Sequence, residues 1–537
     1  MTYIFILFSL AYSFALHQAF SVYCFVKHKE NTFATEVGLF AISAILLFIL
    51  YYYLHYSNFS LKKWFRSNYF VSTILIISFI LRMSSILFFE TYPTMDAYQY
   101  FMDGVKIAEN NYFADAANTP YWPVGYKIFI GILFYFFPKK IIVVQLSQAI
   151  LHLIAEYLMY KIAFKISKNY FVSKITLLLL AIYPNHILYT GLIWSETLFF
   201  TIVLLGFYLL LVCRVCRDKT SLLFFNGLIW GAAALVRPVA MFYPFAFFAA
   251  FFLLRRVTVK ICVKQLLIIY LAFFVILSPW VYRNYKLYDK FILISTNGSL
   301  VLFMTFVVDN DGNKFDEMVK PRGNIDQKDL SKYALNYMME NPYRTLKIIF
   351  RSFKKLYKSD FDGVESIIQS RIPSNIMTGD MLNKVIAAVN PEINLINLKD
   401  VFEKRSDAYY LKQNLSEASK IKIAQTILYS FTYPYWYSED LTLIFVRFIN
   451  SIFYYFVLFT NILLIITTSP KRLISFFKKR PLYLIGPFFI LINTGIYVLS
   501  QGDSRYHYPL MSWFFFATAF FIWKKLVLEC IWSWSWR

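Results

Sequence analysis

Charged residues, glycine and cysteine are all scarce in this 537-residue sequence. Charged side chains make up 16% of it, against about a quarter in an average soluble domain. The 16 glycines and 17 prolines exclude a collagen-like or low-complexity chain. Five cysteines form no disulfide framework, and Cys213 with Cys216 lacks the second pair that a tetrahedral zinc site needs.

Apolar and aromatic residues are abundant instead. Hydrophobic residues account for 59% of the chain, aromatic residues for 21%, and the mean hydropathy is +0.52. Several apolar runs reach the roughly 20 residues that a helix needs to cross the hydrocarbon layer of a bilayer. The sequence therefore predicts an all-α polytopic membrane protein.

Twelve runs are long enough to be membrane spans. They lie near residues 3–26, 36–57, 69–89, 141–164, 171–192, 196–213, 222–238, 239–254, 262–280, 444–467, 482–500 and 508–523. The first has no preceding basic residue and no small-residue cleavage site, so we expect a retained helix and not a signal peptide. Another apolar piece, 128–137, is too short to span and is expected to be a re-entrant or surface-lying helix.

The basic residues predict the topology. The formal charge is +23, and most of the excess lies in short loops between apolar runs. If 128–137 does not span, five basic clusters fall on one side, which should be the cytoplasm. These clusters begin at Lys62, Lys161, Arg214, Arg255 and Lys471. Both termini are then cytoplasmic, and the polar segments 90–140 and 281–440 face outward.

Four regions follow from this topology. Residues 1–67 hold two additional N-terminal spans, and 68–280 form a transmembrane core with the first outer loop. Residues 281–440 form a mainly helical extracytoplasmic cap, and 441–537 hold the last spans. Helices are expected at 329–339 and 343–358; in the second, apolar residues such as Leu346 and Phe350 alternate with basic ones, as in a helix on an anionic bilayer surface.

Charged residues from five separate outer loops fall on one membrane surface. They are Asp96 and Asp103, Glu196, Arg237, Arg283, and Arg505 with His507. Charge at a hydrocarbon boundary is costly unless it is paired or faces water, so this convergence indicates a site between helices. The alternative for each residue is an ordinary water-facing group.

Three polar residues lie deeper in predicted spans. Arg82 precedes Glu90 by eight residues, or ~12 Å at 1.5 Å per residue, so its guanidinium needs an anion partner or a wet cavity. His152 and Glu156 are four residues apart and share a helix face. Two interpretations stay open for that pair: a proton relay, or a polar pin that joins helices.

These groups suit the transfer of a sugar from a lipid phosphate. Arginine is a planar, permanently charged fork that can hold the departing phosphate. A carboxylate within reach of the acceptor hydroxyl can take its proton as the anomeric carbon is attacked. Asp96 and the arginines supply both kinds of group at the membrane surface, where a lipid-tailed donor would meet a water-side acceptor.

Short motifs with the expected sidedness occur in order along the chain. They are Arg82, Asp96-Ala97-Tyr98, Trp122-Pro123-Val124-Gly125-Tyr126, Trp194-Ser195-Glu196, Arg237-Pro238, Pro279-Trp280 before Arg283-Asn284, and Arg505-Tyr506-His507. With these motifs, most of the chain after the first two spans resembles the GT-C superfamily of glycosyltransferases, which includes protein O-mannosyltransferases and lipid A aminoarabinose transferases.

The resemblance implies a GT-C-like fold of about 12 transmembrane helices and an inverting transferase that uses a polyprenyl-phosphate sugar. It makes Asp96 the catalytic base; many relatives have two adjacent acidic residues there, whereas Ala97 follows Asp96 in this chain. Arg82, Arg283 and Arg505 would bind the donor phosphate. Tyr98, Asp103, Glu196, Arg237, Tyr506 and His507 would position the substrates.

The expected setting is the cytoplasmic membrane, with the active site on its extracytoplasmic face. The partners would be the bilayer, the lipid-linked donor and an acceptor that is a glycolipid, polysaccharide or protein, with no nucleic acid. No metal site is indicated, and a divalent metal stays open as a cofactor. Two alternatives remain: a lipid-linked oligosaccharide polymerase or ligase, and a non-catalytic transporter or flippase, although no internal repeat typical of transporters is visible.

Overall fold

The fold is described from a computed structural model of the chain. It describes residues 65–67, 69–89, 91, 93, 96–212, 220–245, 247–248, 258–307, 327–357, 363, 366–367, 441–466, 468–500 and 504–524. Every regular element in these segments is a helix. The predicted spans 3–26 and 36–57, and most of the predicted cap beyond residue 357, lie outside the described residues.

Four described segments are long and apolar enough to cross a membrane. They are α4 (Tyr69–Phe88), α7 (Ile141–Ser167), α13 (Val259–Tyr288), and η5 with α24 (Pro481–Val498). The shorter apolar helices α10 (Glu196–Val212) and α11 (Thr220–Val236) pack among them. These are the helices of a multi-pass membrane protein, and the count of twelve spans stays a prediction.

One predicted span is divided in two. The run 171–192 forms α8 (Tyr170–Ile182) and a short helix, α9 (Pro184–Tyr189), with Tyr183 extended between them. Pro184 causes the break, because proline has no N–H and disfavours helical backbone at the residue before it. Apolar character continues through the break, so the expectation of one continuous helix was wrong here.

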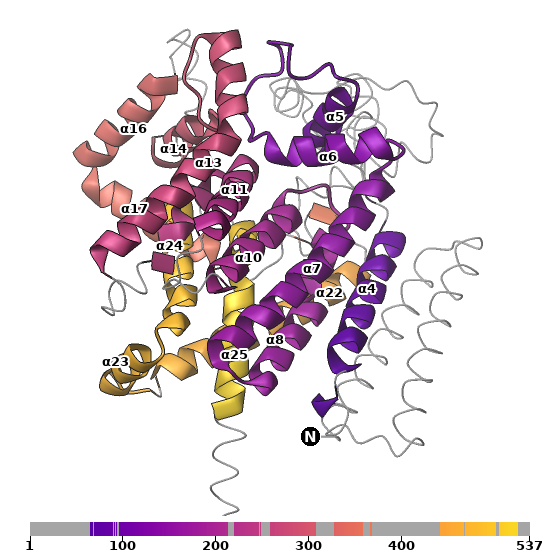
Figure 1. The fold of residues 1–537 in the computed structure, drawn as a ribbon, viewed down its shortest axis with the longest axis vertical. Helices are drawn as coiled ribbons and strands as arrows, with labels where there is room; N and C mark the ends of the chain where they lie inside the picture. Colours follow the sequence, from indigo (N-terminus) through magenta and orange to yellow (C-terminus); the bar gives the residue numbers. More distant parts are fainter. Residues whose placement is uncertain are drawn as a thin grey trace, which may run out of the picture.

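The short apolar segment after the first outer loop forms α6 (Gly125–Phe136), which lies across one end of the bundle together with α5 (Asp96–Ala108) (Figure 1). At 12 residues, α6 is shorter than a span. The two helices approach closely: a Cβ on Gly104 would lie 2.3 Å from Ile130 Cγ2. Glycine therefore allows α5 and α6 to pack as one layer over the bundle end.

Helices α11 and α13 are also joined through glycines. Gly227 and Gly231 are spaced four apart on α11, and a Cβ on Gly227 would lie 2.2 Å from the Ile269 carbonyl oxygen of α13. Small residues four apart bring membrane helices into backbone contact, where dispersion replaces the missing hydrophobic driving force. Helix α11 ends at Val236, and Arg237 follows directly after it.

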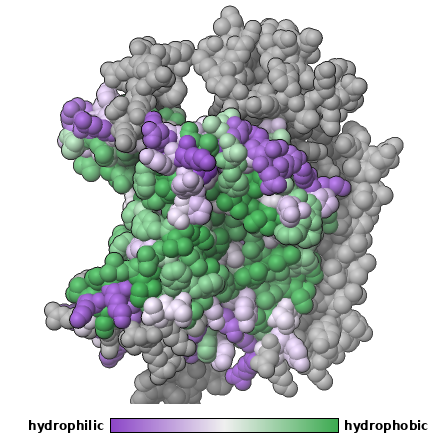
Figure 2. All heavy atoms as spheres, turned by 45° about the horizontal axis from the view of Figure 1, so that its top comes forward, coloured by the Kyte–Doolittle hydropathy of each residue, from purple (hydrophilic) through white to green (hydrophobic). Residues whose placement is uncertain are grey.

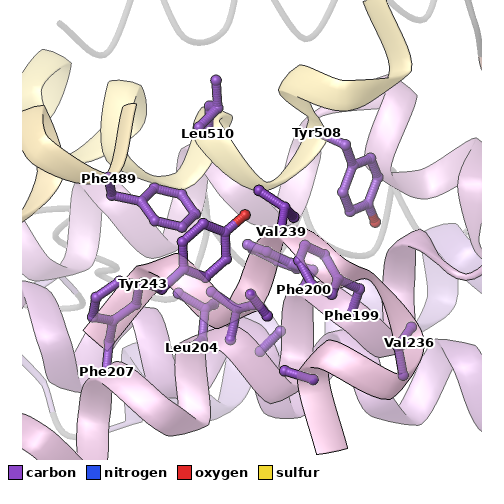
Figure 3. Close-up of a cluster of buried hydrophobic side chains, with 14 of the residues drawn as sticks. Phe199, Phe200, Leu204, Phe207, Val236, Val239, Tyr243, Phe489, Tyr508 and Leu510 are labelled. Carbon is purple, nitrogen blue, oxygen red and sulfur yellow. The ribbon is translucent and has the colours of Figure 1, made fainter. Parts of the chain in front are cut away.

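The C-terminal elements complete the core. Helix α25 (Met511–Ile522) packs on α8 and α22 (Leu441–Ile466), and η6 (Ser504–Leu510) contacts α10. In Figure 3, Phe489 and Leu510 of this part face Tyr243 and Phe207 across a shared apolar cluster. The Tyr243 hydroxyl donates to Asn493 Oδ1 at 2.7 Å. Segments more than 200 residues apart in sequence thus form one core.

The surface has the pattern expected of a protein in a bilayer. Figure 2 shows a broad apolar region with polar side chains gathered at both of its edges. Outside the bundle lie α14 (Asn297–Phe306), α16 (Gln327–Glu340) and α17 (Pro342–Leu356), of which the last two cover the segments where the sequence predicted helices. Helix α23 (Pro470–Lys479) bends by 99° from the end of α22.

We predict that Gly227→Ala destabilises the protein. The new methyl group would meet backbone, which cannot move aside as a side chain can, so overpacking should cost about 1–3 kcal/mol and lower the melting temperature in detergent. Gly495→Ala is the matched control, because a Cβ there meets nothing within 4 Å. Equal melting temperatures for the two variants, measured by fluorescence-detected size exclusion, would contradict close α11–α13 contact.

Candidate active site

Two glutamines of α7 hold the turn that leads into α10. Gln148 Nε2 donates to the carbonyl oxygens of Leu192 at 2.7 Å and Thr190 at 3.2 Å. Gln145 Nε2 donates to the Gly191 carbonyl oxygen at 2.8 Å. These carbonyls fall between two helices, where the amides give them hydrogen-bond donors inside the protein. The turn is fixed by these bonds, and Glu196 follows it.

The first charged pair of the site joins α10 to the end of α11. Glu196 is the first residue of α10, and its Oε1 accepts from Arg237 in an ion pair. Arg237 Nε also donates to Ser195 Oγ at 3.1 Å. Glu196 is only 1% exposed, and its Oε2 has no hydrogen-bond partner among the described residues. One carboxylate oxygen therefore remains available to a bound molecule.

A second guanidinium group belongs to Arg505 of η6, near the C-terminal end of the sequence. The Arg505 guanidinium carbon lies 5.3 Å from the centre of the Trp194 ring and 5.1 Å from that of Tyr506. The Arg237 guanidinium carbon lies 5.6 Å from the same Tyr506 ring. Tyr506 itself stacks on Tyr497, with ring centres 4.3 Å apart. One aromatic ring is thus shared by two arginines.

Asp96 belongs to the same neighbourhood. It begins α5 and is partly buried. Burial raises the pKa of the Tyr100 hydroxyl, the Asp96 carboxylate adds to the rise, and Arg237 and Arg505 oppose it. Burial and the Asp96 carboxylate likewise raise the pKa of Tyr121. The charges of Asp96 and of both arginines thus act on the same Tyr100 hydroxyl.

Aromatic side chains surround these charges. Tyr100 makes edge contacts with Tyr126, at a ring separation of 5.3 Å, and with Trp122, at 6.3 Å. The Tyr126 hydroxyl donates to Gln148 Oε1 at 2.7 Å, which ties α6 to α7.

We refer below to five residues as the outer cluster: Asp96, Glu196, Arg237, Arg505 and Tyr506.

Asp103 makes internal contacts with the helix beside it. Its Oδ2 pairs with Lys127 Nζ at 2.7 Å, and both side chains are 2% exposed. Gln99 Nε2 donates to the other carboxylate oxygen at 2.7 Å. Burial lowers the pKa of Lys127, and Asp103 raises it in part. The pair ties α5 to α6, and sequence reasoning missed Lys127 because it lies within an apolar run.

Arg283 holds the first outer loop. Its Nε donates to the Phe113 carbonyl oxygen at 3.1 Å, and Nη2 donates to those of Asp115 at 2.9 Å and Asn118 at 3.0 Å. Three backbone carbonyls therefore engage most of the N–H donors of this guanidinium group. The described contacts of Arg283 lie in this loop and within α13, and none is with the outer cluster.

Two further residues predicted to position the substrates are Tyr98 and His507. Tyr98 lies partly buried on α5. His507 is fully buried, stacks on Tyr454 at 5.2 Å, and places Nδ1 2.8 Å from the Leu356 carbonyl oxygen. A carbonyl only accepts, so Nδ1 carries the proton. His507 therefore joins η6 to the end of α17.

Arg82 finds its anion inside the protein. Its Nη2 lies 2.8 Å from Glu156 Oε1, and both side chains are fully buried. The Ser78 hydroxyl donates to the same carboxylate oxygen at 2.7 Å, and Arg82 Nη1 donates to the Ala181 carbonyl oxygen at 3.3 Å. Helices α4, α7 and α8 meet at this pair, as the polar-pin interpretation of Glu156 expects.

A chain of hydrogen bonds runs from this pair to η6. Arg82 Nη2 donates to His152 Nδ1 at 2.8 Å, His152 Nε2 lies 3.3 Å from His186 Nδ1, and His186 Nε2 lies 3.1 Å from the Tyr508 carbonyl oxygen. Because the guanidinium only donates and the carbonyl only accepts, each histidine must carry its proton on Nε2. The chain ends two residues after Tyr506, so it helps to position η6.

No group of three or more His, Cys, Asp or Glu side chains that could hold a metal ion occurs within the described residues. The donor set of the outer cluster is two carboxylates with two guanidinium groups, and Glu196 is already paired with Arg237. Guanidinium groups beside carboxylates suit an anionic ligand better than a cation.

Comparison with known proteins found little similarity. No family model and no curated protein sequence matches the chain. Among solved structures, the chain is similar to the archaeal oligosaccharyltransferase AglB from Archaeoglobus fulgidus in complex with an inhibitory peptide and a dolichol-phosphate, with a TM-score of 0.43 and 14% identity. The match covers 88% of this chain and spans about half of AglB, 52%. Similarity at that level carries no residue role to this chain.

The buried ion pair gives a stability prediction. Glu156→Leu should lower the melting temperature strongly, because an unpaired buried guanidinium costs about 3–5 kcal/mol. Adding Arg82→Leu should recover part of the loss, because the pair as a whole is worth much less than either unpaired charge.

The exposed pair between Lys139 and Glu109, whose side chains are 41% and 46% exposed, provides the control. Glu109→Leu should change the melting temperature little. If the Arg82/Glu156 double variant were less stable than either single variant, the two side chains would not form an isolated pair.

Proposed function

We propose that this protein is an integral-membrane glycosyltransferase that moves a sugar from a polyprenyl-phosphate donor to an acceptor on the extracytoplasmic face. One observation supports the proposal: at one end of an apolar helix bundle, Glu196, Arg237 and Arg505 gather around the Tyr506 and Trp194 rings, and Asp96 and both arginines influence the same Tyr100 hydroxyl. A carboxylate beside paired cations is the set of groups that transfer from a lipid phosphate requires.

Arg505 and Arg237 are the proposed ligands of the donor phosphate. Both guanidinium groups border the Tyr506 ring, so one phosphate lying against that ring could reach both. Arginine forks bind phosphate oxygens in pairs and keep their charge at any physiological pH. Arg82 and Arg283, which the resemblance also assigned to the phosphate, have internal partners that give them structural roles.

Asp96 is the proposed base. Its carboxylate accepts the proton of the acceptor hydroxyl while that oxygen forms a bond to the anomeric carbon. The bond between this carbon and the phosphate oxygen breaks, and the leaving phosphate takes the bonding electrons, so its charge increases as the arginines hold it. Attack from the face opposite the phosphate inverts the anomeric centre.

The surrounding groups would orient the sugar. Aromatic rings such as Trp122 and Tyr506 offer apolar faces against which a sugar ring can pack. The free Oε2 of Glu196 is a buried acceptor, and leaving it unsatisfied is costly, so a sugar hydroxyl is a fitting donor. Its pairing with Arg237 links sugar recognition to the phosphate site.

The location of the cluster suits a donor with a lipid tail. Helices α5 and α6 lie at the opposite end of the bundle from α23, whose Lys471, Arg472, Lys478 and Lys479 belong to a predicted cytoplasmic cluster (Figure 1). By the positive-inside bias, the outer cluster then faces away from the cytoplasm. A polyprenyl tail can stay in the bilayer while its phosphate reaches the cluster.

The first functional prediction concerns Asp96. Deleting the gene should remove one sugar mass from a surface glycolipid, polysaccharide or glycoprotein, as read by mass spectrometry. The wild-type gene should restore that mass, and Asp96→Asn should not, because an amide cannot take the proton.

Asp289→Asn is the matched control, since Asp289 is an exposed residue with φ of 50° at the end of α13, a conformation that asparagine adopts readily. Restoration by the Asp96→Asn protein, expressed and folded like the wild type, would remove Asp96 from the mechanism. Transport of the lipid-linked sugar with no covalent product would favour the transporter alternative instead.

The second prediction concerns Arg505. Arg505→Gln should lower kcat/KM for the donor by roughly ten- to a hundredfold, because hydrogen bonds to a charged group are worth about 1.5–3 kcal/mol. Lys286→Gln, which removes an exposed cation at the end of α13, should leave kcat/KM within about twofold of wild type. Equal effects of the two changes on donor kinetics in proteoliposomes would rule out a direct phosphate contact by Arg505.

A further inference from the structure

Helix α17 has an exposed apolar face that the proposed chemistry does not use. Its members lie at positions that follow one another around the helix, and they are exposed by 82% at Tyr343, 65% at Leu346, 60% at Phe350 and 45% at Phe353. Single exposed apolar residues are normal, but four on one face of a 15-residue helix form a patch. Such a face needs a partner or a lipid environment.

A basic face lies beside the apolar one. The face is occupied by five cations, Arg344, Lys347, Arg351, Lys354 and Lys355, and α17 contains no acidic residue. At about 100° per residue, these cations cover the sector next to Tyr343 and Phe350. Lys354 Nζ lies 4.8 Å from the centre of the Phe350 ring, where the two sectors meet.

The third face of α17 packs on the protein. Ser352 and Leu356 are buried there, and the helix contacts α24 and η6. The helix is thus attached to the bundle along one side, apolar on the next and basic on the third. This three-sector arrangement matches a helix at the rim of a membrane protein, with one face toward acyl chains and one toward negatively charged headgroups.

The end of α17 is bound directly to the segment that carries part of the outer cluster. His507 Nδ1 donates to the Leu356 carbonyl oxygen at 2.8 Å, and the Tyr454 hydroxyl donates to the Tyr357 carbonyl oxygen at 3.1 Å. His507 directly follows Tyr506 in η6. A shift of α17 would therefore pull on the backbone that positions Arg505 and Tyr506.

We propose that the phosphate-bearing headgroups of anionic phospholipids bind along the basic face of α17, and that this binding holds η6 in the position that sugar transfer requires. Charge complementarity selects the occupant: five cations without a compensating anion on the helix attract an anionic bilayer surface, while the apolar face enters the same bilayer. The coupling to activity rests on the proposed function, whereas the lipid contact does not.

The lipid contact is measured first, by hydrogen–deuterium exchange of the full-length protein. It is compared in detergent, in nanodiscs of phosphatidylcholine, and in nanodiscs with increasing phosphatidylglycerol. We expect the amides of α17 to exchange at least severalfold more slowly with phosphatidylglycerol than in either other medium. Lys354→Gln/Lys355→Gln should abolish that added protection, because each lysine near the surface contributes substantially to attraction.

The chain offers a matched control on the opposite membrane surface. Lys478→Gln/Lys479→Gln removes the same pair of charges from α23, which has no bond to η6 among the described contacts, and should leave α17 protection unchanged. Phe350→Ser tests the apolar face separately and should weaken protection in every bilayer. Circular dichroism and size exclusion confirm that each variant is folded.

Transfer activity is then measured in the same nanodiscs. We expect phosphatidylglycerol to raise the wild-type rate severalfold, the Lys354→Gln/Lys355→Gln variant to lose this dependence, and the Lys478→Gln/Lys479→Gln variant to keep it. Equal α17 protection in all three media would overturn the anionic-lipid contact and favour cover by another part of the chain. Lipid-dependent protection with a lipid-independent transfer rate would overturn the coupling.

A protein that shows no transfer in any lipid contradicts the proposed function alone, because the exchange data still decide the lipid contact. Protection that appears only on adding an acidic soluble polymer such as polyglutamate, and not with phosphatidylglycerol, would assign the basic face to an acidic protein segment and overturn the proposal.

Discussion

An apolar helix bundle contains no water to satisfy a buried polar group, so each such group must find its partner in the protein. This constraint determines where the segments of the chain meet. Gln145 and Gln148 donate to carbonyl oxygens of the turn before α10, and the Arg82–Glu156 pair joins three helices. Glu196 follows the turn that the glutamines hold, and a chain of hydrogen bonds from the Arg82–Glu156 pair reaches η6, which carries Arg505 and Tyr506. The positions of these three residues therefore depend on polar contacts inside the bundle.

Much of the fold could be predicted because membrane helices are specified by composition and length. The apolar runs indicated α4, α7 and α13, and helical spacing indicated α16 and α17. The break at Pro184 was missed because a hydropathy scale records only the polarity of side chains. It does not record that proline lacks the backbone N–H that a continuous helix needs. Periodicity also identifies the buried face of a helix without naming its neighbour, so the α11–α13 contact through Gly227 became visible only in three dimensions.

The candidate site could be predicted in part, for a related reason. Ordering charged residues by depth identified those that gather at one surface, including Glu196, Arg237 and Arg505. It did not separate them from Arg283 and His507, whose acceptors are backbone carbonyls from segments distant in sequence. Every residue type has the same carbonyl, so no sequence pattern marks such partners. A single charged residue type can thus serve a site or fasten a loop.

A close backbone contact joins α6 to the end of α11, the helix that precedes Arg237. A Cβ on Gly125 would lie 2.7 Å from backbone atoms of Leu235 and Val236, so the first residue of α6 rests on the end of α11, just before Arg237. The contact is between backbone atoms, with no side chain between the two helices that could change its rotamer. A displacement of α6 would therefore also shift the backbone just before Arg237. Under the proposed function, changing the aromatic residues Trp122 and Tyr126 to accept a larger sugar would then disturb the proposed phosphate ligand Arg237 as well.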